Sequence, residues 1–254
     1  SLQRAPGVGK KSAAERAAYS MLRKKDTSHV SLIQFHQNYS YEDFIMGYRP
    51  TDNGFALTPG VFYEFCKEAQ QHPREDYFFL IDEINRGNMS KIFGELLMLI
   101  ENSYRGKPVT LSSNGESFTV PKNLYVIGMM NTADRSLAMI DYALRRRFSF
   151  IELEPGFETE GFKAYQKGLG NEILDKLVAV VERLNEEIKN DSSLGKGFCI
   201  GHSYFCGLKN PKDCTVSWMR EVVEYDILPM LEEYWFDSPA QVAKWESELR
   251  GVLA

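Results

Sequence analysis

The sequence predicts an α/β fold in residues 1–155, where helices flank a parallel sheet, followed by a smaller, mainly helical domain in residues 156–254. Two observations favour this fold. Before Pro155, short apolar runs typical of buried strands alternate with segments whose apolar residues recur at helical spacing, the pattern of parallel βαβ units. After Pro155, amphipathic helical patterns replace the strand-like runs. The 254 residues, of which 43% are hydrophobic, suit one large or two moderate domains.

The elements of the first domain follow from local patterns. Residues 12–23 are rich in strong helix formers, and residues 77–81 form a continuous apolar run suited to a strand buried on both faces. Asn114-Gly115 between short alternating runs is a hairpin signal. In order, we expect a helix at 12–23, a strand at 30–35, a helix at 60–70, a strand at 77–81, a helix at 90–100 capped by Ser90, a hairpin within 110–120, a strand at 124–129, a short helix at 139–146 and a strand at 148–153.

The second domain is expected to contain helices at 173–188, at 218–235 with a break near Pro229, and at 241–249. No apolar run is long enough to span a membrane, and we recognise no signal peptide. The net charge of -5 gives no sign of nucleic-acid binding by the chain as a whole, although a local basic patch is compatible with it.

The four cysteines, Cys66, Cys199, Cys206 and Cys214, form no Cys-x-x-Cys pair. Without a secretory signal, we expect reduced thiols and a cytoplasmic protein. Cys199, Cys206 and Cys214 could form a zinc site with His202, but their spacing does not match the common ligand patterns. We therefore favour partly buried structural thiols.

A glycine-rich turn directly before the first helix has the composition of a phosphate-binding loop. Such a turn presents backbone N–H groups to phosphate, and its lysine reaches the β and γ phosphates. The alternative is a fortuitous turn. The pattern G-x-x-x-x-G-K-[ST] is met at Gly9 and Lys10 and is broken at Arg4 and Lys11. The residues expected to bind the nucleotide here are Pro6, Gly7, Val8, Gly9, Lys10, Lys11 and Ser12.

Both departures have physical consequences. A side chain at Arg4 is costly if the exit from the preceding strand needs a positive φ. A hydroxyl at position 11 would sit on Mg²⁺, whereas the Lys11 cation repels the metal. Ser12 lies about 100° further round the helix and is poorly placed to replace that hydroxyl. Because so few residues precede the loop, we expect a truncated first strand and a chain that begins inside its own sheet.

Asp82 and Glu83 directly follow the apolar run at 77–81. An acidic pair at the end of a buried strand is a Walker B arrangement, in which the aspartate holds Mg²⁺ and the glutamate activates water as general base. The alternative is a strand that ends in a solvated acidic turn. Because the carboxyl ends of parallel strands meet at one sheet edge, we expect this pair to lie near Lys10.

Asn131 and Asp134 follow the strand at 124–129. Polar side chains at such a strand end can point into a ligand cleft, or they can cap the next helix. Arg145, Arg146 and Arg147 then close the helix at 139–146. They could complement the helix macrodipole, act as an arginine finger on a neighbour's γ-phosphate, or contact a DNA backbone.

Several of these segments together resemble the AAA+ motor domain of the McrB family. The matching segments are APGVGK at 5–10, IDEINRG at 81–87, MNTADRS at 130–136, DYALRRRF at 141–148 and GHSYF at 201–205. The likeness runs from the phosphate loop almost to the C-terminus. McrB is the GTPase subunit of the McrBC modification-dependent restriction system. The resemblance therefore implies an AAA+ P-loop NTPase core, here with the truncated first strand expected above, followed by a helical lid domain.

The resemblance also implies site residues and partners. Lys10 would contact the phosphates, Asp82 would organise Mg²⁺, and Glu83 would activate water. Asn131 would position that water, with Asp134 in the same signature. Arg146 would be the trans-acting finger, with Arg147 beside it. The family forms hexameric rings, uses GTP in place of ATP, docks an McrC-type endonuclease, and recognises methylated DNA through a separate N-terminal domain, which we expect to lie outside these residues.

Three functions therefore remain open on the sequence. The first is a GTP-hydrolysing motor of a McrBC-like system, and the second is a non-catalytic AAA+ ring subunit with a degenerate phosphate loop. The third is an ATP-driven chaperone of the MoxR kind. His202 could lie near the nucleotide or simply pack beside aromatic residues. Tyr39, Tyr41 and Phe44 could line a central pore or stack on a partner, although a place in the core is the commoner role for grouped aromatics.

Overall fold

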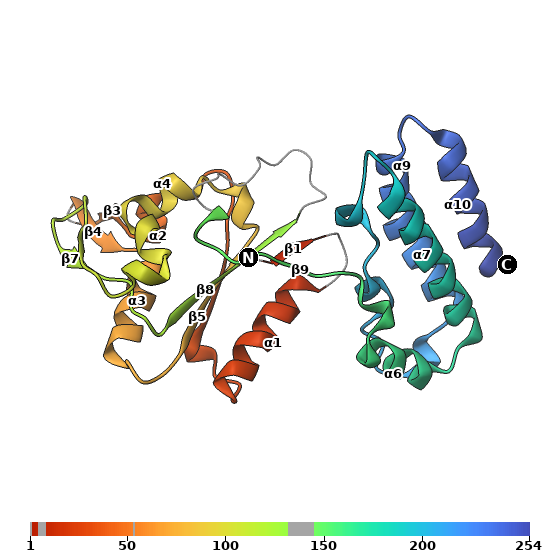
Figure 1. Cartoon of the computed structure of the whole chain (residues 1–254), viewed down its shortest axis with the longest axis horizontal. Helices are drawn as coiled ribbons and strands as arrows, with labels where there is room; N and C mark the ends of the chain where they lie inside the picture. Colours follow the sequence, from red (N-terminus) through yellow and green to blue (C-terminus); the bar gives the residue numbers. More distant parts are fainter. Residues whose placement is uncertain (1, 5–8, 53, 132–144) are drawn as a thin grey trace. The chain divides into compact units, whose positions relative to one another are not determined.

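The computed structural model describes residues 2–4, 9–52, 54–131 and 145–254 (Figure 1). Contacts between Cα atoms divide the chain into two compact units. The sheet unit consists of residues 1–3 and 10–152, and the helical unit consists of residues 4–9 and 153–254. Within the described residues, no helix combines the length and the apolar character needed to cross a membrane.

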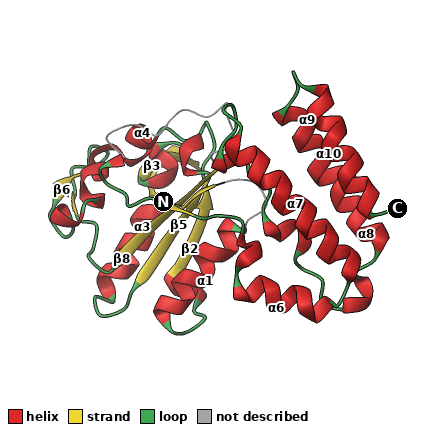
Figure 2. Cartoon of the chain, turned by 45° about the vertical axis from the view of Figure 1, so that its right-hand side comes forward, coloured by secondary structure: helices red, strands yellow, loops and turns green. Residues whose placement is uncertain are grey.

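The sheet has five strands, and the pairs β2–β5, β5–β8 and β1–β9 are parallel. Its order is β2-β5-β8-β1-β9, and Figure 2 shows the strands in yellow. The predicted parallel α/β fold is therefore confirmed. The strands are β1 (Leu2–Arg4), β2 (Val30–Gln34), β5 (Tyr77–Asp82), β8 (Leu124–Asn131) and β9 (Ile151–Glu152).

This strand order creates a place for a ligand. Strands β1 and β8 are neighbours in the sheet. From β1 the chain continues through helix α1 (Lys10–Leu22) to β2, on the β8 side of β1. From β8 it continues to β9, on the opposite side of β1. Connections that leave adjacent strands in opposite directions open a crevice at the strands' carboxyl ends. The start of α1 and the end of β8 both lie at this switch point.

Strand β5 is buried on both faces, as its apolar run predicts. Phe78 and Leu80 belong to a cluster with Ala14 and Ala18 of α1. The alternate residues Tyr77, Phe79 and Ile81 belong to a larger cluster, which includes Phe62 and Cys66 of helix α3 (Val61–Gln71). Phe44 is fully buried in that larger cluster, and Tyr39 and Tyr41 pack against it. The core interpretation of these three aromatics is therefore confirmed.

The helix predicted at 90–100 is wrong in two respects. Helix α4 (Met89–Phe93) is capped by Asn88, whose side chain accepts the Lys91 N–H, so Ser90 is not its cap. The helix then stops at Gly94, whose φ of 50° is unsuited to an α-helix, and a 3₁₀ helix continues over Gly94–Ile100. A Cβ at Gly94 would lie 3.0 Å from the Tyr41 ring, so the glycine also permits this close approach.

Other boundaries shift, and three elements of the sheet unit were not predicted. Strand β8 extends to Asn131, and β9 is shorter than the predicted 148–153. The predicted hairpin is confirmed as β6 (Val109–Thr110) and β7 (Ser117–Phe118) around Gly115, whose φ is 73°. Most of the helix predicted at 139–146 falls outside the described residues. The unpredicted elements are helix α2 (Tyr41–Phe44) and the antiparallel pair β3 (Met46–Thr51) and β4 (Gly54–Pro59).

The helical unit contains more helix than its sequence patterns indicate. Its α-helices are α6 (Glu160–Leu169), α7 (Glu172–Asn190), α8 (Val216–Glu221), α9 (Leu228–Tyr234) and α10 (Pro239–Val252). Pro229 does not interrupt the helical path, because a π-helical segment over Val222–Ile227 joins α8 to α9. Proline lacks an N–H donor, and its ring clashes with the carbonyl four residues earlier in a regular helix. The carbonyl four residues before Pro229 is that of Tyr225, which lies inside the wider π-helical segment.

Short 3₁₀ helices complete the described structure. They are Thr27–His29, Ile84–Arg86, Asn102–Tyr104, Gly156–Glu158, Lys196–Phe198, His202–Phe205 and Pro211–Asp213.

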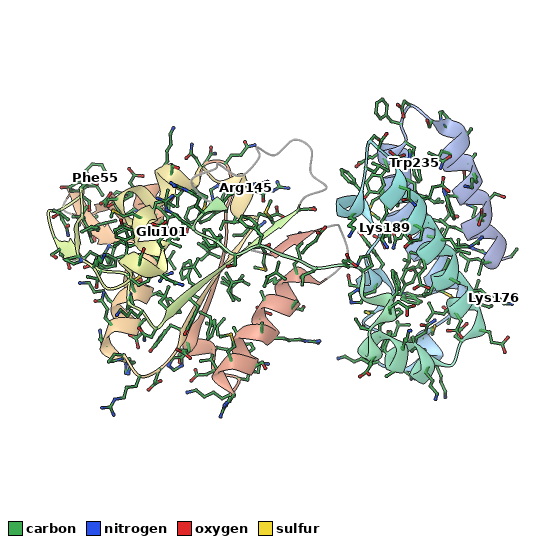
Figure 3. All side chains as sticks on the ribbon, in the orientation of Figure 1. Phe55, Glu101, Arg145, Lys176, Lys189 and Trp235 are labelled. Atoms are coloured by element: carbon green, nitrogen blue, oxygen red, sulfur yellow. The ribbon has the colours of Figure 1, made fainter. Side chains whose placement is uncertain are left out.

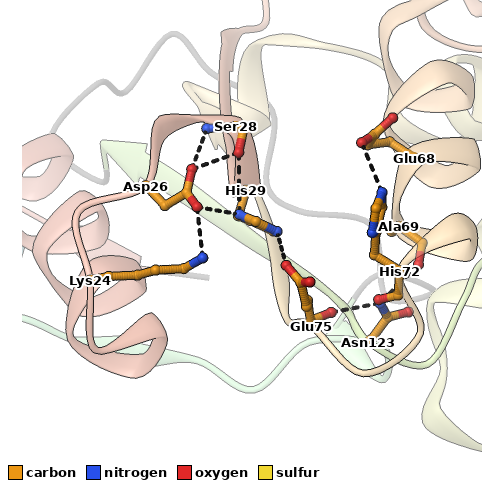
Figure 4. Close-up of polar contacts among 9 residues, drawn as sticks. All are labelled: Lys24, Asp26, Ser28, His29, Glu68, Ala69, His72, Glu75 and Asn123. Atoms are coloured by element: carbon orange, nitrogen blue, oxygen red, sulfur yellow. Dashed lines mark hydrogen bonds and ion pairs between the residues drawn. The ribbon is translucent and has the colours of Figure 1, made fainter.

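A polar network stabilises the amino ends of β2 and β5 (Figure 4). His29, only 7% exposed, lies between two carboxylates, with Nδ1 2.9 Å from Asp26 Oδ2 and Nε2 2.7 Å from Glu75 Oε2. The Lys24 ammonium lies 2.8 Å from Asp26. Hydrogen bonds from Lys24 and then Ser28 hold the pKa of Asp26 well below its usual range. The Asp26 charge is therefore favoured in the folded state.

We expect Asp26→Asn to lower the thermal unfolding midpoint modestly at pH 7. A carboxyl whose pKa is lowered on folding stabilises the protein above its unfolded pKa, and this stabilisation is lost as pH falls through the folded pKa. The difference between variant and wild type should therefore shrink below about pH 4. Thermal unfolding followed by circular dichroism across pH checks this, with the exposed Asp52→Asn as control. A difference that does not change with pH would exclude the charge as its cause.

Candidate nucleotide-binding site

The first residue of α1 reaches the end of β8. The Lys10 Nζ donates a hydrogen bond to the Met130 carbonyl oxygen at 3.2 Å, across 120 positions of sequence. Gly9, directly before it, has a φ of 69°, which glycine adopts without strain. The predicted phosphate-loop lysine therefore lies at the switch point of the sheet. Pro6, Gly7 and Val8 lie outside the described residues.

Lys11 and Ser12 are both exposed on α1, whereas Ala14 and Ala18 form its buried face. The first turn of α1 holds no acidic residue. The partial positive charge of a helix N-terminus and two adjacent ammonium groups together favour a polyanion such as a triphosphate.

The acidic pair lies at the carboxyl end of β5, next to β8. The Phe35 N–H donates to the Asp82 carbonyl at 2.9 Å, and the Asp82 Oδ1 accepts the Glu83 N–H at 3.0 Å. Glu83 has a φ of 50° and a ψ of 44°, in the left-handed region. A non-glycine residue there costs about 1–3 kcal/mol, and such strain tends to occur at functional sites. Glu83 Oε2 lies 3.3 Å from Arg86 Nε.

The turn that carries Glu83 packs against β8 at Gly128, where the missing side chain leaves a notch in the surface of the strand. Ile81 is the register partner of Gly128, and Ile84, only 4% exposed, packs against this glycine. A Cβ built on Gly128 would lie 2.4 Å from Ile84 Cδ1, an impossible contact. One residue further, the Asn85 Nδ2 donates to the Asn131 carbonyl at 3.4 Å. The left-handed turn of Glu83 is thus fitted to the surface of β8.

We expect Gly128→Ala to lower nucleotide hydrolysis about tenfold to a hundredfold, because the added methyl group must displace Ile84 and with it the Glu83 turn. Nucleotide affinity should change little, since Lys10 is not displaced. Steady-state hydrolysis and equilibrium binding measure the two effects. Gly161→Ala, in helix α6 with nothing within 4 Å of its Cβ position, is the matched control. Unchanged turnover in Gly128→Ala would mean that the notch does not position Glu83.

The remaining predicted residues of this site are only partly described. Asn131 is the last residue of β8 and is half-buried, whereas Asp134 lies outside the described residues. Arg145, labelled in Figure 3, and Arg146 are exposed, and Arg147 is half-buried. Phe148 and Phe150 pack against the large core cluster, which anchors the chain just after these arginines.

Sequence reasoning missed Gly128 and Arg86 as parts of this site. A signal for Gly128 exists, because a glycine inside an otherwise apolar strand often marks a close approach of another segment. Arg86 belongs to the IDEINRG motif, but nothing in the sequence alone shows that its guanidinium meets Glu83.

A magnesium ion bound with a nucleoside triphosphate needs one or two protein ligands, because phosphate oxygens and water supply the rest. The half-buried Asp82 carboxylate at the sheet edge fits this requirement. Lys11 does not, since an ammonium group cannot ligate a cation. Among the described residues, no group of three histidine, cysteine or acidic side chains is arranged to hold a metal ion.

His202 lies in the helical unit, where its Nδ1 accepts the Gly156 N–H at 2.9 Å. Three cysteines lie near His202 in the sequence. Of these, Cys199 and Cys214 are buried and Cys206 is exposed.

Comparison with known proteins identifies the family. Residues 2–148, more than half of the chain, match the AAA domain of the dynein-related subfamily. The chain belongs to this AAA family. Residues 176–243 match the alpha-helical lid domain of McrB. The chain is therefore an AAA NTPase domain followed by an McrB-type lid, and the resemblance drawn from the motifs is confirmed.

Two curated relatives of this AAA domain are subunits of restriction enzymes. The chain is 51% identical over 259 residues to the type IV methyl-directed restriction enzyme EcoKMcrB subunit of Escherichia coli (strain K12), covering 98% of this chain and 56% of that protein. It is 25% identical over 242 residues to the type II restriction enzyme BsuMI component YdiS of Bacillus subtilis (strain 168), covering 76% and 70%. The chain thus spans little more than half the length of the E. coli subunit.

Proposed function

We propose that this AAA domain hydrolyses GTP and drives an McrC-like endonuclease that cuts modified DNA, as part of a hexameric ring. The observation that carries the proposal is the contact between Lys10 and Met130, because it brings the phosphate-loop lysine to the sheet edge that also holds Asp82 and Glu83. The similarity to the EcoKMcrB subunit supports the restriction context. The choice of GTP follows from the resemblance of the motifs to the McrB family.

Each proposed residue has a role that its chemistry allows. The backbone of the phosphate loop cradles the phosphates and Lys10 offsets their charge, while Asp82 holds Mg²⁺, which screens the β and γ phosphates when bound. Asn131 positions the attacking water, and Asp134 belongs to the same signature. The phosphate-binding residues are Pro6, Gly7, Val8, Gly9, Lys10, Lys11 and Ser12.

Glu83 is the general base in this proposal. The water oxygen bonds to the γ-phosphorus while the bond from that phosphorus to the bridging oxygen breaks, and GDP leaves with the bond's electron pair. The water proton passes to Glu83. Glu83 Oε2 lies beside Arg86 Nε, so in this proposal the carboxylate turns from the guanidinium toward the water.

Arg146 is proposed as the finger that a neighbouring subunit supplies, with Arg147 beside it. Its exposure and the anchoring of the following Phe148 support a side chain directed at another protein rather than at its own core. Such a finger stabilises charge on the transferring phosphate, and a ring of subunits is what places it there. DNA contact is assigned to a separate N-terminal domain.

A second candidate is a non-catalytic ring subunit, and Lys11 favours it. A subunit that binds nucleotide poorly with Mg²⁺ could still supply Arg146 to an active neighbour.

Binding and turnover by the protein expressed from its complete gene test these proposals. We expect fluorescent GTP to bind, unlabelled ATP to displace it only weakly, and a co-expressed McrC-like endonuclease to raise hydrolysis. Native mass spectrometry with GTP should give six copies. Displacement by ATP at the same concentration as GTP would support a MoxR-like ATP-driven chaperone instead. Binding without hydrolysis, with or without the endonuclease, would support the non-catalytic subunit.

A further inference from the structure

The first residue of the Gly156–Glu158 turn is held by a distant side chain. The buried Gly156 N–H donates to His202 Nδ1 at 2.9 Å, across 46 positions of sequence. The His202 ring lies so close that a Cβ on Gly156 would be 2.9 Å from Cε1 and 3.1 Å from Nδ1. The position therefore requires glycine for space. The Thr159 hydroxyl, which caps α6, donates to the Gly156 carbonyl at 2.6 Å, so both backbone groups of Gly156 are engaged.

The segment that carries His202 is in turn fixed to α7. Asn185, only 4% exposed, accepts the Ile200 N–H on its Oδ1 at 2.6 Å and donates from its Nδ2 to the Ile200 carbonyl at 2.9 Å. The Asn185 side chain thus satisfies both backbone groups of Ile200, as a neighbouring strand would. Ile200 lies two residues before His202. A buried amide that satisfies both groups of a neighbouring residue fixes its backbone strongly.

Aromatic residues fix the plane of the imidazole. The rings of Phe157 and Phe162 lie nearly perpendicular to it, with centroids 6.2 Å and 5.7 Å away. Phe157 also lies 6.1 Å from Phe205, which is fully buried. The ring is therefore held by packing as well as by its hydrogen bond.

We infer that His202 is a positioning residue. Together with Asn185, it fastens Gly156 to α7, so that the helical unit is rigid from Gly156 onward. Bending of the chain is then confined to the residues before Gly156. Hinges commonly use a few residues at the ends of elements. The exposed ion pair of Glu154 and Lys196, at 3.4 Å, is too weak to extend the rigid part. The inference rests on the proposed function only where it concerns turnover of GTP. There, His202 acts by positioning Gly156 and does not contact GTP.

Hydrogen exchange of the Gly156 amide in the complete protein tests the contact directly. His202→Leu keeps the bulk but removes the acceptor, so the Gly156 amide should exchange about tenfold faster or more. His202→Asn places an amide oxygen where Nδ1 lies and should restore most of the protection. Gly156→Ala should behave like His202→Leu, because the added methyl group displaces the ring. His72→Leu, at an exposed histidine, is the control. Unchanged exchange in His202→Leu would overturn the inference.

Nucleotide measurements separate this role from direct ligation. We expect His202→Leu to lower kcat about tenfold with the Kd for fluorescent GTP changed less than about twofold, and His202→Asn to recover kcat. If both variants weaken GTP binding equally while the Gly156 amide stays protected, His202 is a nucleotide ligand and the inference fails. If the wild-type protein does not hydrolyse GTP, the proposed function fails, and amide exchange alone still decides the role of His202.

Discussion

Replacing Lys11 with threonine is expected to raise Mg²⁺-dependent GTP hydrolysis about tenfold to a hundredfold, because the new hydroxyl can join Asp82 in holding the metal. Lys11 is exposed at the second residue of α1, so the substitution removes no packing contact. Threonine is a weaker helix former than lysine, but this costs only a few tenths of a kcal/mol. Hydrolysis measured against Mg²⁺ concentration should show both a higher plateau and a lower half-saturating concentration.

Two further variants separate the hydroxyl from the charge. Lys11→Met removes the cation without adding a ligand, so it should relieve repulsion of the metal but give less turnover than threonine. Lys25→Thr, at an exposed position beyond the end of α1, makes the same change away from the phosphate loop and should have no effect. If Lys11→Thr binds GTP with Mg²⁺ and still does not hydrolyse it, the chain is better explained as a non-catalytic ring subunit.

The sheet and its edge could be predicted from the sequence because they depend on short-range patterns. The run from Tyr77 to Ile81 is apolar at every position, which only a strand covered on both faces can use. Lys10 follows β1, and Asp82 and Asn131 end β5 and β8 of the same sheet, so their meeting at one edge follows from topology. The strand order itself was not predicted, but the switch point between β1 and β8 agrees with these positions.

The elements that the sequence did not reveal depend on long-range contacts. Gly94 ends α4 because it adopts a positive φ beside the Tyr41 ring, a contact that no local pattern announces. The hairpin of β3 and β4 carries exposed Tyr48 and Phe55, so its strands lack the alternation of a half-buried sheet. Likewise the left-handed turn of Glu83 depends on the space left by Gly128, 45 residues later.

Glu83→Gln is expected to reduce GTP hydrolysis by about 10²–10⁴-fold, the usual contribution of a general base, while leaving GTP binding intact. The test is sharpest in the Lys11→Thr background, where turnover is expected to be higher. Glutamine has the shape of glutamate, so it should preserve the left-handed turn and the packing of Ile84 against Gly128. What it removes is the ability to accept the proton of the attacking water.

Glu68→Gln, an exposed carboxylate on α3, makes the same chemical change away from the site and should leave hydrolysis unaltered. Lys10→Ala should give the complementary result, with GTP binding itself weakened, because this lysine faces the phosphates in the proposed site. A contrary outcome is that Glu83→Gln retains full turnover while Gly128→Ala loses it. In that case the Glu83 turn would be needed to position a different catalytic group. Asp82 is then the candidate, since its carboxylate accepts the N–H of Glu83 and would move with the same turn.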